Sequence, residues 1–318
     1  MAFDIAFIGL GAIGYPMAAS VRRGMEADAH IHIFDVNGDA CRKFQSEFAR
    51  IGRVEIGNSP SNVAARAKVV ISMVPGPKEV QHVYLHATNG IIAAPRDEER
   101  LLIECSTIDA QTARSVADDM KLAGRGLYVD APVSGGVPAA EVGTLSFMIG
   151  HEVPTPGDRM AERLQQIITM MGDPEKLFWC GTMGTGLSAK ISNNYISCSV
   201  LLLVAEAMAT GIACGVDTQV LWNIIHNSTG QTFMGDNVCP APGVVPHAPS
   251  SNGWKLGFKT QMFLKDLSLG IEAARRASIQ PTMAEAAYTV YENAAKDPRC
   301  KDRDGSSVYL YITDSKEA

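Results

Sequence analysis

The stretch Ile5-Ala6-Phe7-Ile8-Gly9-Leu10-Gly11-Ala12-Ile13-Gly14 decides the fold of this chain. Its apolar first four residues predict a buried strand, which leads directly into a G-x-G-x-x-G pattern. In that pattern the first glycine permits a tight turn and the second lets the backbone approach a pyrophosphate. The third lets the next helix pack closely, and the N-terminal N–H groups of that helix favour anions. The sequence therefore predicts a dinucleotide-binding turn.

Further short apolar runs follow as far as residue 180, separated by patterns with helical spacing. This alternation predicts a parallel sheet with helices on both faces, because buried parallel strands are apolar throughout. The expected strands are 5–8, 30–34, 69–73, 101–104, 127–130, 145–149 and 177–180, and the helices between them include 112–123 and 159–171. Residues 1–182 are thus predicted to form a Rossmann-type α/β domain with a doubly wound parallel sheet.

The sequence changes character after residue 183, where only helical patterns remain. We expect helices at 186–214, 217–227, 259–277 and 282–296, and no strand. Residues 183–318 are therefore predicted to form an all-helical substrate and oligomerisation domain, which a long interdomain helix joins to the first. The segment 230–257 is rich in Pro, Gly, Ser and Asn, and a loop of that length is usually functional.

The composition of the 318 residues argues against several classes of protein. A net charge of −6, with no run of Lys and Arg longer than a pair, argues against a nucleic-acid partner. Seven scattered cysteines without a C-x-x-C pair indicate a reducing compartment. Because an apolar strand already begins at Ile5, no targeting segment is expected. The predicted location is cytoplasmic, or mitochondrial if a leader has been removed.

The most apolar stretch, 196–214, is long enough to cross a membrane. Glu206 lies inside it, and Lys190, Asn193 and Asn194 precede it on the same helix, so we expect no membrane partner. A helix that is apolar nearly all round is usually buried in a large soluble core. With charged residues at only 19%, this predicts packing against another subunit in a homodimer or homotetramer. The alternative is a helix buried within its own domain.

Asp35 ends the second expected strand, about twenty residues beyond the last glycine of the turn. A carboxylate there can accept hydrogen bonds from the adenine ribose hydroxyls of NAD, and it repels the 2′-phosphate of NADP. The next residues contain no Arg, and Arg42 lies a turn or more into the following helix. We therefore expect NAD rather than NADP, and the alternative is that Asp35 only caps a helix.

Three segments follow later strands, at the carboxyl edge of the sheet where ligands of such folds bind. Two of them are Met73-Val74-Pro75 and Cys105-Ser106-Thr107, which could equally form ordinary turns. The third, Ser134-Gly135-Gly136, exposes backbone N–H groups and a hydroxyl. These groups suit a carboxylate, although a glycine-rich loop that binds no ligand has the same sequence pattern.

Lys190 and Asn194 lie four residues apart near the start of the long helix, which places them on one face. An amine and an amide can therefore meet one substrate there. Partial burial near a helix N-terminus lowers the pKa of an amine, so such a lysine can exchange a proton with a hydroxyl near neutral pH. The alternative is a pair of side chains on a solvated face.

In this order and at these distances, the motifs described above resemble those of the β-hydroxyacid dehydrogenase family, and within it those of the 3-hydroxyisobutyrate dehydrogenases. The resemblance runs from about Ile5 to Tyr311 and includes Pro240-Ala241-Pro242-Gly243-Val244, Lys265-Asp266-Leu267 and Ser306-Ser307-Val308. It implies a cofactor site made of Gly9, Leu10, Gly11, Ala12, Ile13, Gly14, Asp35, Val74, Pro75, Thr107 and Lys265. It implies that Ser134, Gly135 and Gly136 bind the substrate carboxylate, and that Lys190 and Asn194 are catalytic.

The activity implied by the resemblance is a metal-free hydride transfer between NAD and a small 3-hydroxy acid. The implied pair is 3-hydroxyisobutyrate and methylmalonate semialdehyde, as in valine degradation, with Lys190 as acid/base. Two alternatives stay open. One is a reductase of another small semialdehyde, of the tartronate or succinate type, or of an imine. The other is a non-catalytic cofactor-binding protein, which would tolerate the loss of Lys190.

One departure from the family pattern and two histidine pairs also bear on these expectations. The stretch Ser228-Thr229-Gly230-Gln231-Thr232-Phe233-Met234 replaces a Ser-Gly-Arg-aromatic pattern, so a basic residue near the substrate is missing. We expect Gln231 and Phe233 to shape the pocket, and the plainer alternative is a loop that packs only on protein. Two histidine pairs have metal-like spacing, His30 with His32 and His82 with His86. The first pair lacks a third ligand nearby in the sequence and the second lacks the H-E-x-x-H glutamate, so no metal site is expected.

Overall fold

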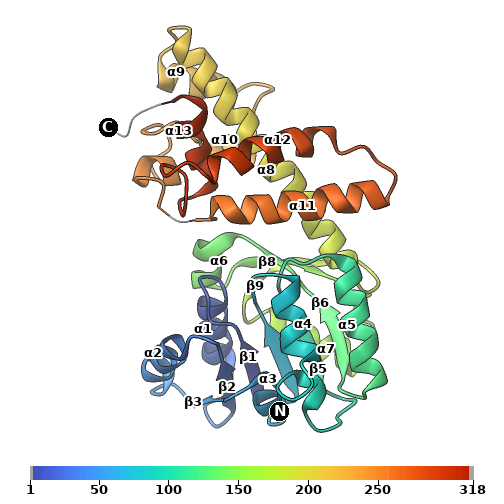
Figure 1. Cartoon of the computed structure of the whole chain (residues 1–318). Coiled ribbons are helices and arrows are strands. Elements are labelled where there is room, and N and C mark those ends of the chain that lie inside the picture. The colour runs from blue at the N-terminus through green and yellow to red at the C-terminus, as the bar shows by residue number, and fades with distance from the viewer. Residues whose placement is uncertain (1–2, 256, 315–318) are drawn as a thin grey trace. The chain divides into compact units, whose positions relative to one another are not determined.

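A computed structural model describes residues 3–255 and 257–314 of the chain (Figure 1). Six strands form a sheet in the order β3-β2-β1-β4-β5-β6, and every neighbouring pair is parallel. The strands are β1 (Ile5–Ile8), β2 (His30–Phe34), β3 (Arg53–Ile56), β4 (Val69–Ser72), β5 (Leu101–Glu104) and β6 (Leu127–Asp130). The strand order reverses between β1 and β4, and ligands of open parallel sheets bind at such a point.

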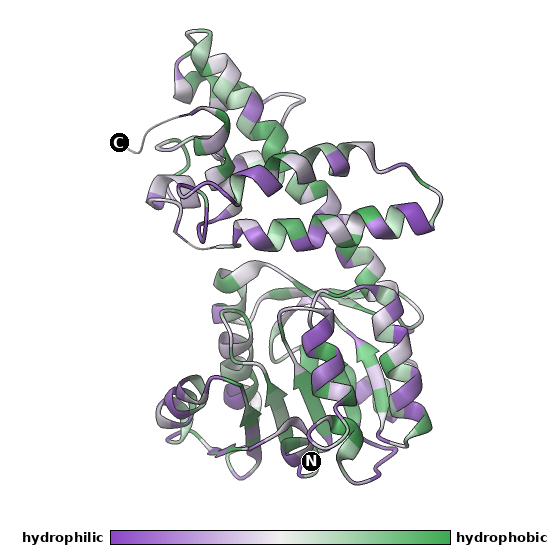
Figure 2. Ribbon diagram, viewed as in Figure 1, coloured by the Kyte–Doolittle hydropathy of each residue, from purple (hydrophilic) through white to green (hydrophobic). Residues whose placement is uncertain are grey.

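Helices cover both faces of this sheet, because its strands are apolar on both sides. Phe7 and Ile71 face one buried cluster, whereas Ile8 and Val70 face another. The helices are α1 (Gly14–Gly24), α2 (Gly38–Phe48), α3 (Pro60–Ala64), α4 (Pro77–Leu85), α5 (Ala110–Leu122), α6 (Gly136–Val142) and α7 (Arg159–Ile168), with a short 3-10 turn η1 (Ile91–Ala93). The hydropathy colouring shows the sheet as the green centre of this unit (Figure 2). The doubly wound α/β prediction is confirmed.

The structure corrects two details of the predicted sheet. First, β3 was not expected, because its four residues alternate polar and apolar over too short a length. Second, the last two expected strands belong to a separate sheet, in which β7 (Val133–Ser134) pairs antiparallel with β8 (Leu145–Ile149) and β8 pairs parallel with β9 (Gly172–Trp179). The chain leaves the large sheet at Pro132, which has no N–H for a ladder.

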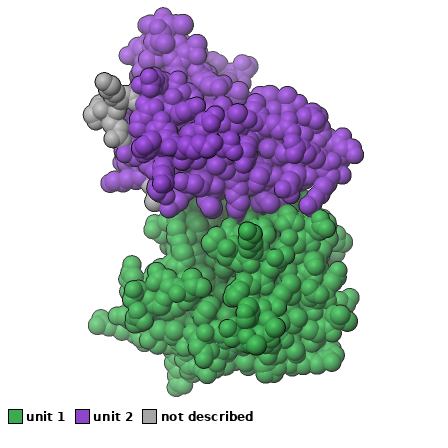
Figure 3. Space-filling view, in the orientation of Figure 1, with its two compact units in different colours: residues 1–190 green, residues 191–318 purple. Residues whose placement is uncertain are grey.

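The chain divides into two compact units, residues 1–190 and residues 191–318 (Figure 3). The boundary predicted at residue 182 precedes this division by eight residues (190 − 182), near the start of the long helix α8 (Thr185–Ala213). The other helices are α9 (Thr218–His226), α10 (Phe233–Asn237), α11 (Thr260–Arg276), α12 (Thr282–Ala294) and α13 (Val308–Ile312), with 3-10 turns η2 (Pro249–Asn252) and η3 (Gly305–Ser307). Among the described residues of the second unit there is no strand, as expected.

The segment 230–257 is less irregular than expected, since it contains α10 and η2. Thr232 caps α10 by accepting a hydrogen bond from the N–H of Gly235 at 3.0 Å. The hydroxyl of Ser250, in η2, donates to the buried carbonyl of Cys239. Side-chain hydrogen bonds of this kind order a segment whose composition suggests a loop.

Helix α8 is long and apolar enough to cross a membrane by length and composition, with a mean hydropathy of 1.9 over its most apolar window. Of that window, 39% is buried inside the protein. One such helix is weak evidence for a membrane span, because core helices of soluble proteins have the same composition. Several of its buried residues, including Leu201 and Met208, belong to the core of the second unit together with Leu267 and Tyr291.

Candidate active site

The three glycines of the first turn differ in what surrounds them. Gly9 has φ +96°, and a Cβ on it would lie 2.2 Å from the carbonyl oxygen of Met73. A Cβ on Gly14 would lie 2.1 Å from the carbonyl oxygen of Gly9. A Cβ on Gly11 would meet nothing within 4 Å. The first and third glycines are therefore required by the protein's own packing, whereas the second borders open space that a ligand can enter.

Asp35 fixes the turn that follows it and the glycine turn at once. Its Oδ2 accepts a hydrogen bond from the N–H of Leu10 at 2.6 Å, and its Oδ1 accepts one from the N–H of Asn37 at 2.6 Å. The alternative reading of Asp35 as a helix cap is wrong, because the N-cap of α2 is Asn37, whose side chain accepts from Asp39. Asp35 instead joins two loops at the carboxyl edge of the sheet.

A pocket of about 570 Å³ adjoins these loops. It is lined by Leu10, Gly11, Ala12 and Tyr15 on one side and by Asn37, Asp39, Ala40 and Lys43 on the other. The guanidinium of Arg42, one turn into α2, forms an ion pair with the carboxylate of Asp39, which lines this pocket. The open space at Gly11, the half-buried carboxylate of Asp35 and this pocket together fit the diphosphate and adenosine of a dinucleotide.

A buried hydrogen-bond network positions the loops after β4 and β5. The N–H of Val74 donates to Ser106 Oγ at 2.8 Å, and the N–H of Ser106 donates to Glu104 Oε1 at 2.7 Å. Ser72 Oγ donates to Glu104 Oε2 at 2.6 Å and lies 2.7 Å from the Tyr84 hydroxyl. Glu104 therefore holds together the backbone that presents Val74 and Thr107.

Burial raises the pKa of Glu104 to about 7, against an ordinary value of 4.5, although the hydrogen bonds from Ser106 and Ser72 act in the opposite direction. Sequence reasoning missed this residue, because a carboxylate inside an apolar strand has no motif of its own. The neighbouring Cys105 is buried, and burial raises the pKa of its thiol well above the ordinary value. That finding agrees with a buried thiol rather than a nucleophile.

The loop after β7 has the backbone geometry expected of a glycine-rich cradle. Gly135 has φ +126° and Gly136 has φ +66°, a region that other residues rarely adopt, and both are exposed. Ser134 is half-buried at the end of β7. The two glycines therefore turn the chain sharply beside the serine and leave their backbone accessible.

The start of helix α8 is held by the carboxylate of Asp130, at the end of β6. Its Oδ1 accepts from the N–H of Gly184 at 2.7 Å, and its Oδ2 accepts from the N–H of Leu187 at 2.8 Å. A Cβ on Gly150 would lie 1.9 Å from the same carboxylate, so the glycine there is required. Burial raises the pKa of Asp130, and the two backbone bonds oppose that effect. Asp130 thus fixes the backbone at the start of α8, the helix that carries Lys190. The sequence did not reveal this role.

Lys190 and Asn194 are both buried, with 7% and 6% of their surface exposed, one helical turn apart on α8. The solvated-face alternative is therefore wrong. Asn194 Nδ2 donates to Asp266 Oδ2 at 2.6 Å, and Asn194 Oδ1 accepts from Asn193 Nδ2 at 3.1 Å. Asp266, on α11, is itself buried and lies 3.3 Å from the ammonium of Lys265. The structure thus adds Asp266 as the partner of two predicted site residues within the second unit.

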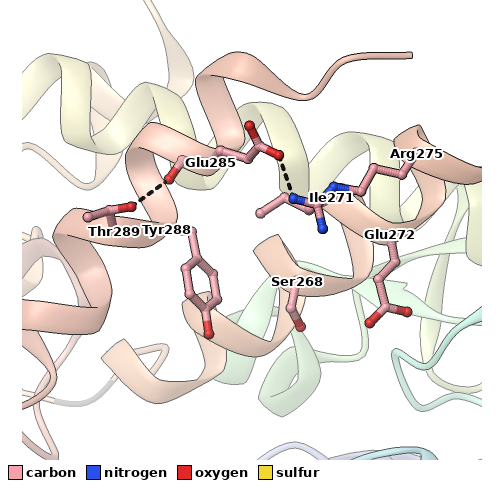
Figure 4. Close-up of a pocket in the computed structure, with 7 residues that line it drawn as sticks. All are labelled: Ser268, Ile271, Glu272, Arg275, Glu285, Tyr288 and Thr289. Carbon is pink, nitrogen blue, oxygen red and sulfur yellow. Dashed lines mark hydrogen bonds and ion pairs between the residues drawn. The ribbon is translucent and has the colours of Figure 1, made fainter. Parts of the chain in front are cut away.

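Gln231 and Phe233 occupy different environments. Gln231 Nε2 donates to Asp236 Oδ2 at 3.0 Å, and His226 Nδ1 lies 2.7 Å from the other oxygen of that carboxylate. Phe233, at the start of α10, is 73% exposed. A separate pocket of about 290 Å³ lies between α11 and α12, where Arg275 and Glu285 form an ion pair of 2.6 Å (Figure 4). It is lined by none of the predicted site residues.

The histidine pairs also differ. His82, on α4, and His86, at its C-cap, have ring centroids 4.6 Å apart and ring planes tilted by 54°. His30 and His32, which were expected to lack a third ligand, instead have Asp4 beside them, and the three residues could hold a metal ion. A third ligand is thus present, because Asp4 directly precedes the neighbouring strand β1 and reaches the pair from a distant part of the sequence.

Comparison with known proteins first defines the class. Residues 4–181 match a family model described as the NAD binding domain of 6-phosphogluconate dehydrogenase. Residues 184–312 match one described as NAD-binding of NADP-dependent 3-hydroxyisobutyrate dehydrogenase. The fold, the glycine turn and these matches together define an oxidoreductase that binds a nicotinamide dinucleotide.

Individual relatives then define the family. The mitochondrial 3-hydroxyisobutyrate dehydrogenase of Mus musculus is 35% identical and matches 98% of this chain and 88% of its own. The NAD-dependent L-serine dehydrogenase of Pseudomonas aeruginosa is 35% identical, with 91% of each chain covered. A structure of Mycobacterium tuberculosis 3-hydroxyisobutyrate dehydrogenase with L-serine has a TM-score of 0.83 at 32% identity, covering 98% and 99% of the two chains. This chain belongs to the 3-hydroxyisobutyrate dehydrogenase family of β-hydroxyacid dehydrogenases.

Proposed function

We propose that the chain is an NAD-dependent dehydrogenase that oxidises 3-hydroxyisobutyrate to methylmalonate semialdehyde. The observation that carries the proposal is the pair Lys190 and Asn194, both buried and one turn apart on a helix whose start is fixed by Asp130. A non-catalytic cofactor-binding protein would have no need to bury an amine and an amide at these positions, since burial of polar groups is costly. The family membership supports the same reaction class.

A bound nicotinamide cofactor would supply the hydride chemistry, as the acceptor of the hydride from the carbinol carbon of the substrate. Lys190, initially as the neutral amine, takes the proton of the substrate hydroxyl, and in the reverse direction its ammonium returns that proton. Asn194 orients the substrate: an amide nitrogen has two hydrogens, and the bond to Asp266 uses one of them. Ser134, Gly135 and Gly136 bind the carboxylate through a hydroxyl and backbone N–H groups. No metal takes part in these steps.

We assign the diphosphate to the turn from Gly9 to Gly14 and the adenosine ribose to Asp35. Val74, Pro75 and Thr107 are assigned to the nicotinamide side and Lys265 to the cofactor. NAD is the proposed form, since a 2′-phosphate would lie beside the Asp35 carboxylate. The guanidinium of Arg42, in α2, forms an ion pair with the carboxylate of Asp39.

Cofactor choice is tested by comparing kcat/KM for NAD and NADP in the natural protein and in Asp35→Asn. We expect NAD to be preferred, and the preference to shrink in the variant because a neutral amide no longer repels the phosphate. A preference for NADP in the natural protein would contradict the assignment. The comparison of the two cofactors is needed because the description of one matching family names an NADP-dependent enzyme.

The substrate is tested with 3-hydroxyisobutyrate, 3-hydroxypropionate, serine, glycerate and 4-hydroxybutyrate, with NADH formation followed by absorbance. Lys190→Ala is compared with Lys121→Ala, an exposed lysine of α5. We expect turnover of 3-hydroxyisobutyrate that Lys190→Ala abolishes and Lys121→Ala leaves unchanged. Turnover that persists in Lys190→Ala would remove the proposed acid/base.

L-serine is the second candidate substrate, because one relative is an L-serine dehydrogenase and one related structure contains L-serine. Higher kcat/KM for serine than for 3-hydroxyisobutyrate would favour it. Activity only in the direction of reduction would favour another semialdehyde, of the tartronate or succinate type, or an imine.

We also propose that the chain is a homodimer or homotetramer. Helix α9 is apolar, yet none of its residues is buried. Val220 and Ile224 lie one turn apart on it and are 51% and 54% exposed. Contiguous exposed apolar side chains are typical of subunit interfaces. Light scattering at micromolar concentration tests this, and a monomeric mass would overturn it.

A further inference from the structure

Four side chains with metal-binding atoms meet at the amino edge of the large sheet, in the first unit. His30 and His32 lie on one face of β2, because side chains two residues apart in a strand share a face. Asp4 directly precedes β1, and Glu55 lies on β3, opposite His32 in the strand register. In a parallel sheet this edge is opposite to the one that carries the glycine turn, so the cluster is separate from the candidate active site.

The carboxylate of Glu55 faces the same nitrogen of both rings. Its Oε1 lies 2.9 Å from His30 Nδ1, and its Oε2 lies 3.3 Å from His32 Nδ1. The two rings are stacked, with an interplanar angle of 24°. An ionised carboxylate only accepts hydrogen bonds, so His30 Nδ1 carries a hydrogen and, in a neutral ring, its Nε2 carries a lone pair. His32 has a carboxylate oxygen 3.3 Å from each ring nitrogen, so a metal ion at Nε2 would replace a hydrogen there. Glu55 therefore bonds Nδ1 of both rings and leaves Nε2 as the candidate ligand atom. This is the arrangement in which a second carboxylate orients histidine ligands toward a metal.

Asp4 supplies a third ligand on that side. Its Oδ2 lies 3.3 Å from His32 Nε2, while its Oδ1 is fixed by the backbone N–H of His30 at 2.8 Å. Ligand atoms about 2.0–2.1 Å from a tetrahedral ion are about 3.4 Å apart, so this pair already has the required separation. One ligand atom from each of Asp4, His30 and His32 lies within 4.8 Å of the others.

Two arginines contact this cluster, and one of them would oppose a bound metal ion. Arg53 Nη1 lies 3.1 Å from His30 Nε2, the atom that would bind the metal. Arg66 Nη1 donates to Glu55 Oε2 at 3.0 Å, which leaves Glu55 in place as an acceptor. Arg53 is exposed, so its side chain can move into solvent. The arginine and a metal ion would thus compete for the same lone pair.

We propose that Asp4, His30 and His32 form a binding site for one divalent transition-metal ion, zinc by preference, with Glu55 as the residue that orients both histidines. Two imidazoles and a carboxylate are a ligand set that zinc accepts, with water at the fourth position. The ion would link the segment before β1 to β2, so its expected effect is on stability rather than on hydride transfer.

The test uses metal-free full-length protein and zinc chloride, with bound zinc measured after equilibrium dialysis and Tm measured by thermal unfolding. We expect one zinc per chain and a rise in Tm with zinc. Asp4→Asn and His30→Gln should weaken binding more than tenfold, and Glu55→Gln by about 10- to 100-fold. Arg53→Gln should tighten binding, an effect that a purely structural hydrogen-bond network does not produce.

His82→Gln/His86→Gln is the matched control, since it removes the other pair of adjacent histidine rings. It should bind zinc as the natural protein does. Cobalt substitution reports the ligand type, and its spectrum should lack thiolate charge-transfer bands, because the site contains no cysteine. Absence of bound zinc, thiolate bands, or binding that Asp4→Asn and His30→Gln leave unchanged would overturn the proposal. Circular dichroism establishes that each variant is folded.

Discussion

The side-chain amide of Asn194 donates to the buried carboxylate of Asp266 at 2.6 Å, which links helix α8 to helix α11 within the second unit. The same carboxylate lies 3.3 Å from the ammonium of Lys265. Two residues assigned from their sequence context thus share a partner that was not assigned. Because Asp266 is bonded to Asn194, we assign it as a positioning residue that acts through that amide.

Removal of this partner is expected to affect catalysis through Asn194. In Asp266→Ala the amide loses its acceptor and can rotate, so kcat should fall by about tenfold or more, since orientation contributes several kcal/mol to such reactions. Asp266→Asn keeps an oxygen acceptor and should recover much of the loss. Steady-state kinetics with 3-hydroxyisobutyrate measures both variants. Equal kcat in the natural protein and Asp266→Ala would show that the bond does not position Asn194.

Replacement of Asp130 should destabilise the start of α8. Asparagine has one acceptor oxygen in place of two, so either Gly184 or Leu187 would keep a buried N–H without a partner. A loss of about 1–3 kcal/mol in the free energy of unfolding is expected for Asp130→Asn. Urea unfolding measures it, and Asp28→Asn, at an exposed aspartate, is the control. A loss no greater than in the control would contradict the role of Asp130.

Glu104 should make stability depend on pH. Its pKa in the folded protein, about 7, is above the ordinary 4.5, so the folded state binds the proton more tightly than the unfolded state. The stabilisation is therefore fully present below about pH 4.5 and is lost as the pH rises through about 7, up to roughly 3 kcal/mol. Glu104→Gln should reduce the fall in unfolding free energy between about pH 5 and pH 8. An unchanged pH dependence would argue against a protonated Glu104.

Substitutions at the glycines of the first turn should distinguish effects on the protein's own packing from effects on cofactor binding. Gly11→Ala adds a Cβ into open space, so stability should change little while the KM for NAD rises by about tenfold or more. Gly14→Ala places a Cβ against the carbonyl of Gly9 and should lower Tm even without cofactor. Thermal unfolding and NAD titration distinguish the two. An unchanged KM in Gly11→Ala would mean that the diphosphate does not pass this residue.

The amino-acid sequence by itself determined the Rossmann-type unit, the glycine turn, the four longer helices of the second unit (α8, α9, α11 and α12) and the placement of Lys190 and Asn194 on one helix face. These features depend on local patterns: parallel strands buried on both faces are apolar throughout, and helical residues four apart share a face. The strand β3 and the small sheet of β7, β8 and β9 were missed, because their short segments lack a clear period.

Only the tertiary structure decided which polar side chains meet. Asp266 reaches Asn194 across 72 positions of sequence, and Asp130 reaches Leu187 across 57. Asp4, directly before β1, and Glu55, on β3, join His32 from either side of β2. No periodicity marks such residues, since a buried carboxylate is stabilised by partners that the fold brings to it from distant segments.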